Sequence, residues 1–148
     1  MTPRCMRNNN PLNIRRGANW IGLAPEQTDR EFCRFSSMVY GWRAAFVLLT
    51  RTYYFKYHLS TIRKIITRWA PPRENKTEGY ISHVSKKTGL PPDESIGPPS
   101  MHPYEWMAIA WAMAEFEGAE FAAKDVFPML EGWKLAYDKT LKGDYKQE

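Results

Sequence analysis

The stretch MHPYEWMAIAWAMAEFEGAEF, residues 101–121, predicts a strong helix whose apolar pattern decides how the rest of the chain is interpreted. Ser100 is a candidate N-cap residue, and Pro103 falls near the first turn, where proline is tolerated. On a helical wheel at about 100° per residue, one stripe collects the apolar residues of a core-facing helix: Trp106, Ile109, Ala110 and Met113. Glu117 takes the next position on this stripe, at the end of the helix.

A carboxyl group at position 117 is chemically unusual, because an unpaired carboxylate is costly to bury. Either an arginine pairs with Glu117, or the site opens into a cleft where a raised pKa is useful. The negative end of the helix dipole would raise the pKa further, and a protonated glutamate in an apolar cleft can act as a general acid. Glu115 falls roughly opposite Trp106, and Glu120 lies beyond Gly118. A glutamate at a fraying helix end also commonly reaches solvent, so periodicity alone leaves both roles open.

The composition is that of a globular protein with a positive charge. The 148 residues suffice for one domain with a core, and 43% of them are hydrophobic. The net charge of +5 suits nucleic acid, an anionic membrane surface or a cell wall, although the basic residues are spread as on a solvated surface. The 14% aromatic share fits a core or a ligand-binding groove. No stretch approaches the roughly 18 apolar residues of a membrane span, and no signal peptide is evident.

The remaining sequence predicts further helices and one irregular region. Residues 7–36 are rich in Asn, Gly and Pro and predict a loop with one or two short strands. Residues 36–57 predict a helix of four or five turns with Ser37 as its cap, in which Gly41 marks close packing. Three shorter helices are expected to begin after Ser60, Asn75 and Asp125 and to stop at Pro71 and Pro72, at Gly89, and near residue 141.

Other chemistries have little support in the sequence. Cys5 and Cys33 either pair or stay free, and a Cys33 nucleophile has no local partner. His58, His83 and His102 lack the spacing of metal ligands, so we expect no metal and no cofactor. Residues 60–81 can be drawn as two helices around a turn with basic side chains facing phosphate: Arg63, Lys64, Arg68, Arg73 and Lys76. The proline-rich turn and the acidic cap region argue against it, and we expect no nucleic-acid partner.

Three strings carry a resemblance: RNNNPLNIRRGANWIGL (7–23), DREFCRFSSMVYGWRAAFVLL (29–49) and STIRKIITRWAPPRENKTEGYISHVSKKTGL (60–90). Together they resemble a family of phage and prophage virion proteins that includes the muralytic protein of an enveloped double-stranded RNA phage. The string RWAPP-x-EN-x-T-x-x-Y is the specific part, and a weaker match runs from AIAWAMAEFEG to the Gly-Trp of LEGWKLA. Family members often show Glu-Asn-Gly where this chain has Glu117-Gly118-Ala119.

The resemblance implies a lysozyme-like fold that acts on bacterial peptidoglycan. The expected class is mainly α, as a single lysozyme-like domain over residues 1–148 with a small irregular β region near the N-terminus. Too few residues precede Pro11 for the early catalytic helix of many lysozyme-like enzymes, and the candidate glutamate comes late. That order is consistent with a circularly permuted arrangement.

The same resemblance suggests a division of roles among residues. Glu117 would be catalytic, and the substrate-binding candidates are Asn10, Asn13, Arg15, Trp20 and Tyr80. Asn13 and Arg15 would bind acetamido or lactyl groups, and Tyr80 would stand on the far wall. A turn at residues 8–10 and a hydrophobic pin at Trp20 are equally open, and Arg73, Glu74 and Asn75 would only cap a helix.

The predicted function is a peptidoglycan glycosidase, either a muramidase or a lytic transglycosylase, that uses Glu117 as general acid. A hydrolase needs a second carboxylate roughly 5–9.5 Å away; Glu26, Asp29 and Glu31 are the candidates, and none stands out. The alternatives are a non-catalytic virion or secretion-system component that binds the wall, and a peptidoglycan endopeptidase.

The expected partner is peptidoglycan rather than nucleic acid or membrane, with an immunity or virion partner protein left open. We expect synthesis in the bacterial cytoplasm without a signal peptide and action in the periplasm or cell wall. Delivery by phage, holin or secretion system would bring the protein there.

Overall fold

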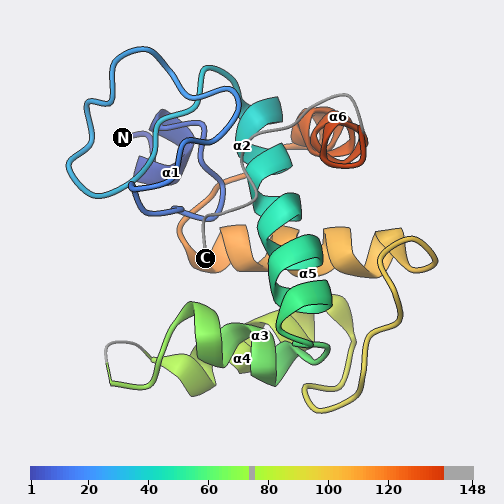
Figure 1. Ribbon diagram of the computed structural model, residues 1–148. Helices are drawn as coiled ribbons and strands as arrows, with labels where there is room; N and C mark the ends of the chain where they lie inside the picture. Colours follow the sequence, from blue (N-terminus) through green and yellow to red (C-terminus); the bar gives the residue numbers. More distant parts are fainter. Residues whose placement is uncertain (74–75, 139–148) are drawn as a thin grey trace.

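The computed structural model describes residues 1–73 and 76–138, and within these ranges the protein is mainly helical. The elements are α1 (Arg4–Arg7), α2 (Met38–Phe46), η1 (Val47–Lys56), α3 (Ile62–Trp69), α4 (Thr77–Thr88), α5 (Pro103–Phe116), η2 (Ala123–Asp125) and α6 (Val126–Ala136). In Figure 1, α2 runs through the middle of the molecule and α5 crosses it, with α6 beside α2 and with α3 and α4 at the far end. The predicted mainly α class is confirmed.

The long helix predicted over residues 36–57 forms, but its second half is a π-helix instead of an α-helix. α2 follows Ser37, and the next ten residues, η1, continue it as a π-helix. At the junction the Thr50 hydroxyl donates to the carbonyl oxygen of Phe46 at 2.6 Å. Such a bond to the carbonyl four residues earlier also occurs in ordinary α-helices, so it accompanies the change to a π-helix without explaining it.

The core is built on both sides of α5, which packs along α4 and touches α2 through Trp111. All four predicted stripe residues are buried: Trp106, Ile109, Ala110 and Met113. Trp42 of α2 is fully buried, and its ring stacks on Trp111 with centroids 6.1 Å apart and on Phe46 at 5.6 Å. Aromatic rings therefore join α2 to α5, and α6 closes over α2 through Gly132, which lies directly against Trp42.

The N-terminal region is less regular than predicted. Among the described residues the expected strands reduce to two isolated antiparallel bridges, Arg15 to Phe32 and Leu23 to Phe35. Single backbone bonds cross the loop, such as those from the Cys33 N–H to the Ile14 carbonyl oxygen (2.9 Å) and from the Ala24 N–H to the Arg34 carbonyl oxygen (2.9 Å). Gln27 adds to them, because it donates to the carbonyl oxygens of Ala24 (2.9 Å) and Arg34 (2.7 Å) and accepts from the Arg34 N–H. Backbone and side-chain bonds together therefore satisfy the loop without a regular ladder. The short helix α1 was not predicted.

Several helix ends differ from the predicted ones. Thr61, not Ser60, caps α3, because its hydroxyl accepts from the Lys64 N–H at 3.1 Å. α5 begins after His102 rather than Ser100, with Pro103 in its first turn as predicted. α6 follows Asp125 but ends at Ala136, earlier than expected.

Two further helix ends concern α4. Gly89 ends it in the left-handed conformation (φ 74°), as predicted. The cap predicted at Asn75 lies outside the described residues.

Gly41 permits the closest contact between α2 and the N-terminal loop, as its position in the helix predicted. A methyl group there would overlap the carbonyl oxygen of Asn9. Gly41→Ala should therefore lower the unfolding free energy by about 1–3 kcal/mol, the usual cost of overpacking, measured by urea denaturation. The matched control is Gly79→Ala in α4, where nothing lies within 4 Å of the added carbon and higher helix propensity should stabilise slightly. Equal effects at both positions would contradict the packing explanation.

Candidate functional site

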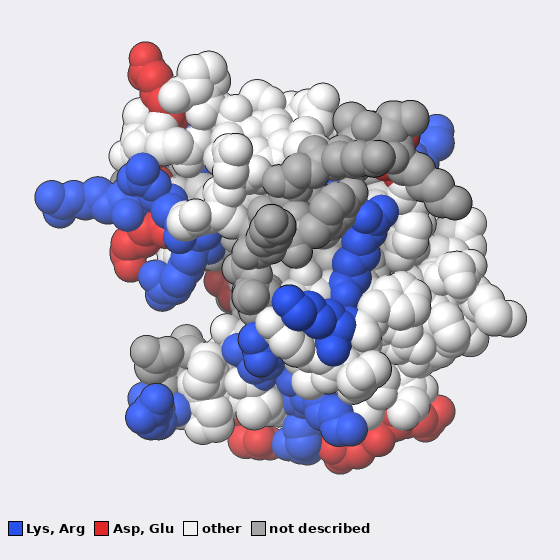
Figure 2. Space-filling view, viewed as in Figure 1, with Lys and Arg blue, Asp and Glu red and all other residues white. Residues whose placement is uncertain are grey.

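A cavity of about 750 Å³ opens between the N-terminal loop and the end of α3. Figure 2 shows the molecule hollowed on this side, with Lys and Arg side chains above and below the hollow. The loop contributes residues 13–18, Trp20 and Phe32, and η1 contributes Leu48 and Tyr53. Residues 68–71 and Glu117 complete the lining. The wall therefore combines aromatic rings, guanidinium groups and one carboxyl group.

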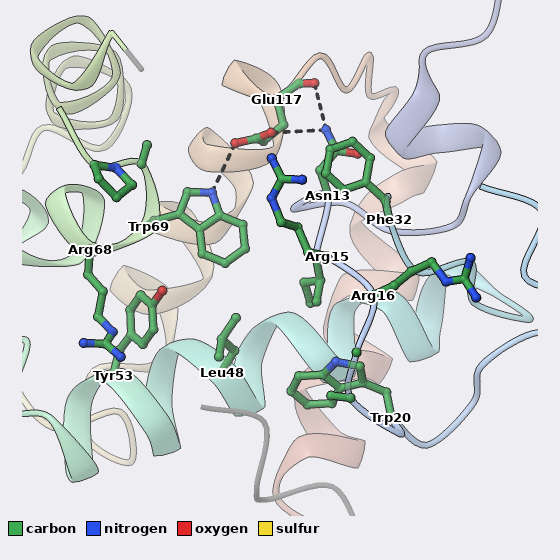
Figure 3. Close-up of a pocket in the computed structure, with 15 residues that line it drawn as sticks. Asn13, Arg15, Arg16, Trp20, Phe32, Leu48, Tyr53, Arg68, Trp69 and Glu117 are labelled. Carbon is green, nitrogen blue, oxygen red and sulfur yellow. Dashed lines mark hydrogen bonds between the residues drawn. The ribbon is translucent and has the colours of Figure 1, made fainter. Parts of the chain in front are cut away.

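Glu117 is held at the cavity by three hydrogen bonds from three different parts of the chain, and Figure 3 draws those from Asn13 and Trp69. Its Oε1 accepts from Asn13 Nδ2 at 3.1 Å. Its Oε2 accepts from Trp69 Nε1 at 3.1 Å and from Tyr80 Oη at 2.9 Å. Among ion pairs between described residues none includes Glu117, so neutral donors alone fix the carboxyl group. Oε1, with a single donor, keeps room to exchange a proton with a ligand.

Tyr80 supports the carboxyl group from behind. The tyrosine is 2% exposed, and its ring stacks on Phe116 with centroids 4.1 Å apart. Burial raises the pKa of Tyr80 well above its ordinary value, and the adjacent Glu117 raises it further. The phenol therefore stays protonated and can donate to Glu117 across the physiological pH range.

The local backbone explains why Glu117 projects at this point. Glu117 is the last residue of the helical turn, since its N–H bonds the Met113 carbonyl oxygen at 3.0 Å and Gly118 follows with φ 114°. That conformation favours glycine. On the opposite wall Asn13 has φ 53°, a left-handed conformation that asparagine tolerates better than most residues, and this turn directs its amide toward Glu117.

The other carboxyl groups considered from the sequence lie elsewhere. Glu115 Oε1 lies 3.8 Å from Lys87 Nζ, and Glu120 is exposed. Asp29 takes two bonds of 2.7 Å from Arg4. Glu31 is shared between Arg4 and Arg15, and Glu26 is exposed. Of the described residues that line the cavity, Glu117 is the sole acidic one.

The structure brings together most of the predicted site. Asn13, Arg15 and Trp20 line the cavity with Glu117, and Tyr80 lies behind it. Asn10 must be corrected: it is fully buried, and its amide donates to the carbonyl oxygens of Ile14 (3.0 Å) and Cys33 (2.8 Å). Both of these hydrogen bonds stay within the loop, so the buried side chain cannot reach a substrate.

Sequence reasoning missed several lining residues. Trp69 was not among the predicted site residues, since it continues the helical spacing of the apolar residues after Ser60, yet its indole N–H bonds Glu117. Its place just before Pro71, in the most specific string of the sequence, was the available signal. Arg68 in the same string and Arg16 beside the predicted Arg15 also line the cavity, and both were overlooked for it. Tyr53 lines it as well, and nothing in its local sequence indicated this, because its segment meets the others only in the fold.

The structure gives little support to the alternative sites, which are a cysteine nucleophile and a phosphate-binding surface. Cys5 and Cys33 are both free and buried, and burial raises the pKa of each thiol, which opposes a nucleophilic role. Arg63 is bound by Asp93 (2.7 Å) and Glu78 (3.0 Å) and so is not directed at phosphate. In residues 1–73 and 76–138 no group of three potential metal ligands occurs. Over the same ranges, every helix is too short or too polar to cross a bilayer.

The geometry thus defines a mainly helical protein with one carboxyl group held in an aromatic and basic cavity. The chain is similar to Protein P5 of Pseudoalteromonas phage PM2, with 46% identity over 97 residues. The match covers 63% of this chain and 60% of the length of that protein. No family model matches the chain. The similarity supports a phage relationship, and the name of the relative states no activity, so the muralytic function stays a prediction.

Asp29 provides a pH-dependent anchor for the loop beside the cavity. Arg4 holds the pKa of Asp29 far below its usual range, helped by the N–H groups of Phe32 and Glu31. A lowered folded-state pKa gives stability that is present above the unfolded value of about 3.9 and lost as the pH falls below it. Asp29→Asn should therefore be less stable than wild type at about pH 7, and the difference should shrink toward about pH 3.

Urea denaturation at several pH values measures this difference. Glu26→Gln is the matched control, since Glu26 is exposed, and it should follow wild type throughout. A gap between wild type and Asp29→Asn that stays constant with pH would contradict the assignment.

Proposed function

We propose that this protein cleaves the glycan strands of bacterial peptidoglycan, with Glu117 as its acid and base. The observation that carries the proposal is the placement of Glu117: one carboxyl group, half-buried, at the wall of a large cavity and oriented by three neutral donors. The half-buried ring of Trp69 supplies an apolar surface on which a sugar ring can pack, with the buried rings of Tyr53 and Trp20 behind the cavity wall. A lysozyme-like fold is part of the same proposal.

The chemistry follows from the carboxyl group and its surroundings. The protonated Glu117 gives its proton to the glycosidic oxygen, and the bond from that oxygen to the anomeric carbon breaks. The resulting carboxylate is stabilised by the donors Asn13, Trp69 and Tyr80. It then takes the proton of the attacking hydroxyl group, so that the residue ends the cycle as it began.

The source of the attacking hydroxyl distinguishes two reactions. A muramidase uses water and commonly a second carboxylate, whereas a lytic transglycosylase uses the 6-hydroxyl of the muramyl residue and forms an anhydro sugar. Since the described lining holds no second acidic residue, we favour the transglycosylase. Mass spectrometry of released fragments separates the outcomes: anhydro-muramyl ends support it, reducing ends indicate a muramidase, and free peptides indicate an endopeptidase.

Glu117→Gln should reduce the clearing of purified cell walls to the rate in buffer, because an amide cannot deliver the proton. The glutamine oxygen can still accept from Trp69 and Tyr80, and rotation of the Asn13 amide would pair its other end, so the melting temperature should change little. Glu120→Gln is the matched control, since Glu120 is exposed and does not line the cavity. Clearing by folded Glu117→Gln at the wild-type rate would sink the proposed role.

Trp69→Phe should lower the clearing rate about ten- to hundredfold, the effect of losing one hydrogen bond to a charged group that reacts. Phenylalanine keeps most of the ring and removes only the N–H that reaches Oε2. The measurement is the initial rate on purified walls, with wall binding and melting temperature followed in parallel. A rate equal to that of wild type would show that the indole does not position Glu117.

A second candidate function is a non-catalytic phage component that binds the wall. The similarity to a phage protein whose name carries no activity favours it. Wild-type protein that sediments with walls but never clears them would select this alternative. Delivery by phage, holin or secretion system would serve either function, since both act in the periplasm or cell wall.

A further inference from the structure

The charge around the cavity is more than a neutral sugar chain requires. Three arginines contribute to its lining, Arg15, Arg16 and Arg68. In Figure 3 the guanidinium group of Arg15 points toward Glu117, and those of Arg16 and Arg68 point away from it. The three arginines stand on both walls: Arg15 and Arg16 belong to the N-terminal loop, and Arg68 lies in α3. In Figure 3 Arg16 and Arg68 lie at opposite sides of the cavity. These arginines therefore flank Glu117 from two sides of the cavity.

The two loop arginines remain accessible to a ligand. Arg15 is 72% exposed and has one acidic neighbour, Glu31, at 3.4 Å, while its guanidinium lies 5.3 Å from the centre of the Phe32 ring. Arg16 is exposed and donates to the backbone carbonyl oxygen of Asp29 at 3.1 Å, a neutral partner. Weak exposed contacts of this kind are easily exchanged for a ligand carboxylate, which arginine binds through two parallel hydrogen bonds.

We infer that the cavity takes glycan that still bears its stem peptides, whose free carboxylates bind Arg15 and Arg16 while the sugar chain lies against Glu117. This inference rests on the proposed function and adds a substrate class to it. Neutral glycans such as chitin offer the guanidinium groups nothing to bind. Peptides recur along a peptidoglycan strand, so carboxylates would reach the cavity walls beside the cleaved bond.

The test compares two forms of one wall. Sacculi from a Gram-negative bacterium carry no teichoic acid, so the stem peptides supply their negative charge. One portion stays native, and the other is treated with carbodiimide and methylamine, which converts its carboxylates to neutral amides. Sedimentation with Glu117→Gln protein measures binding without cleavage. Amidation should weaken binding about tenfold, the loss expected for a charge-assisted hydrogen bond.

Arginine-to-glutamine variants show which residues bind the wall carboxylates. The double variant Arg15→Gln, Arg16→Gln, built on the Glu117→Gln background, should bind native sacculi about tenfold more weakly and should no longer distinguish the two wall forms. Arg30→Gln on the same background removes one exposed charge outside the cavity and should leave the preference intact. Equal binding of the parent to both wall forms, or an equal loss in the Arg30 variant, would overturn the inference.

Clearing by the wild-type protein is scored separately. If native walls are never cleared, the proposed cleavage fails, while the binding preference still decides the inference about carboxylates. If native and amidated walls are both cleared at the same rate, cleavage stands and the inference falls.

Discussion

The carboxyl group of Glu117 is the point on which the site depends, because it joins parts of the chain that lie far apart in sequence. Its donors come from 104, 48 and 37 residues away, on the loop, α3 and α4. All three are neutral, so they orient the group without neutralising it. Glu117, at the end of α5, thus ties the two cavity walls formed by the loop and α3 to α4 behind them.

The helices were the predictable part of the fold. Periodicity identified the stripe of α5, because burial of one face imposes a repeat on the sequence, and a serine cap with a long apolar run identified the helix over residues 36–57. No feature of the sequence indicated the π-helical part of that helix, η1. The expected strands were wrong in detail, because single backbone bonds and side-chain amides satisfy the loop and no periodic signal marks them.

The site was predictable where a residue violated its local pattern and unpredictable where it obeyed one. Glu117 was visible because a carboxyl group continued an apolar stripe. Trp69 was hidden because a tryptophan at helical spacing is ordinary core, and only the fold reveals that its N–H faces Glu117. Asn10 shows the reverse error: a polar residue in a promising motif proved to be internal scaffolding. A motif can indicate which residues matter without separating those that build a wall from those that face a ligand.

The irregular hydrogen bonding of the N-terminal loop has a consequence for the changes of sequence that the loop can tolerate. In a strand ladder, inserting one residue shifts the register of every neighbour. Here single backbone bonds and the amides of Asn10 and Gln27 fix the loop at discrete points, and residues 17 and 18, which line the cavity, lie between such points and outside the two bridges. We expect this short segment to tolerate a change of length or chemistry while the three hydrogen bonds to Glu117 stay in place.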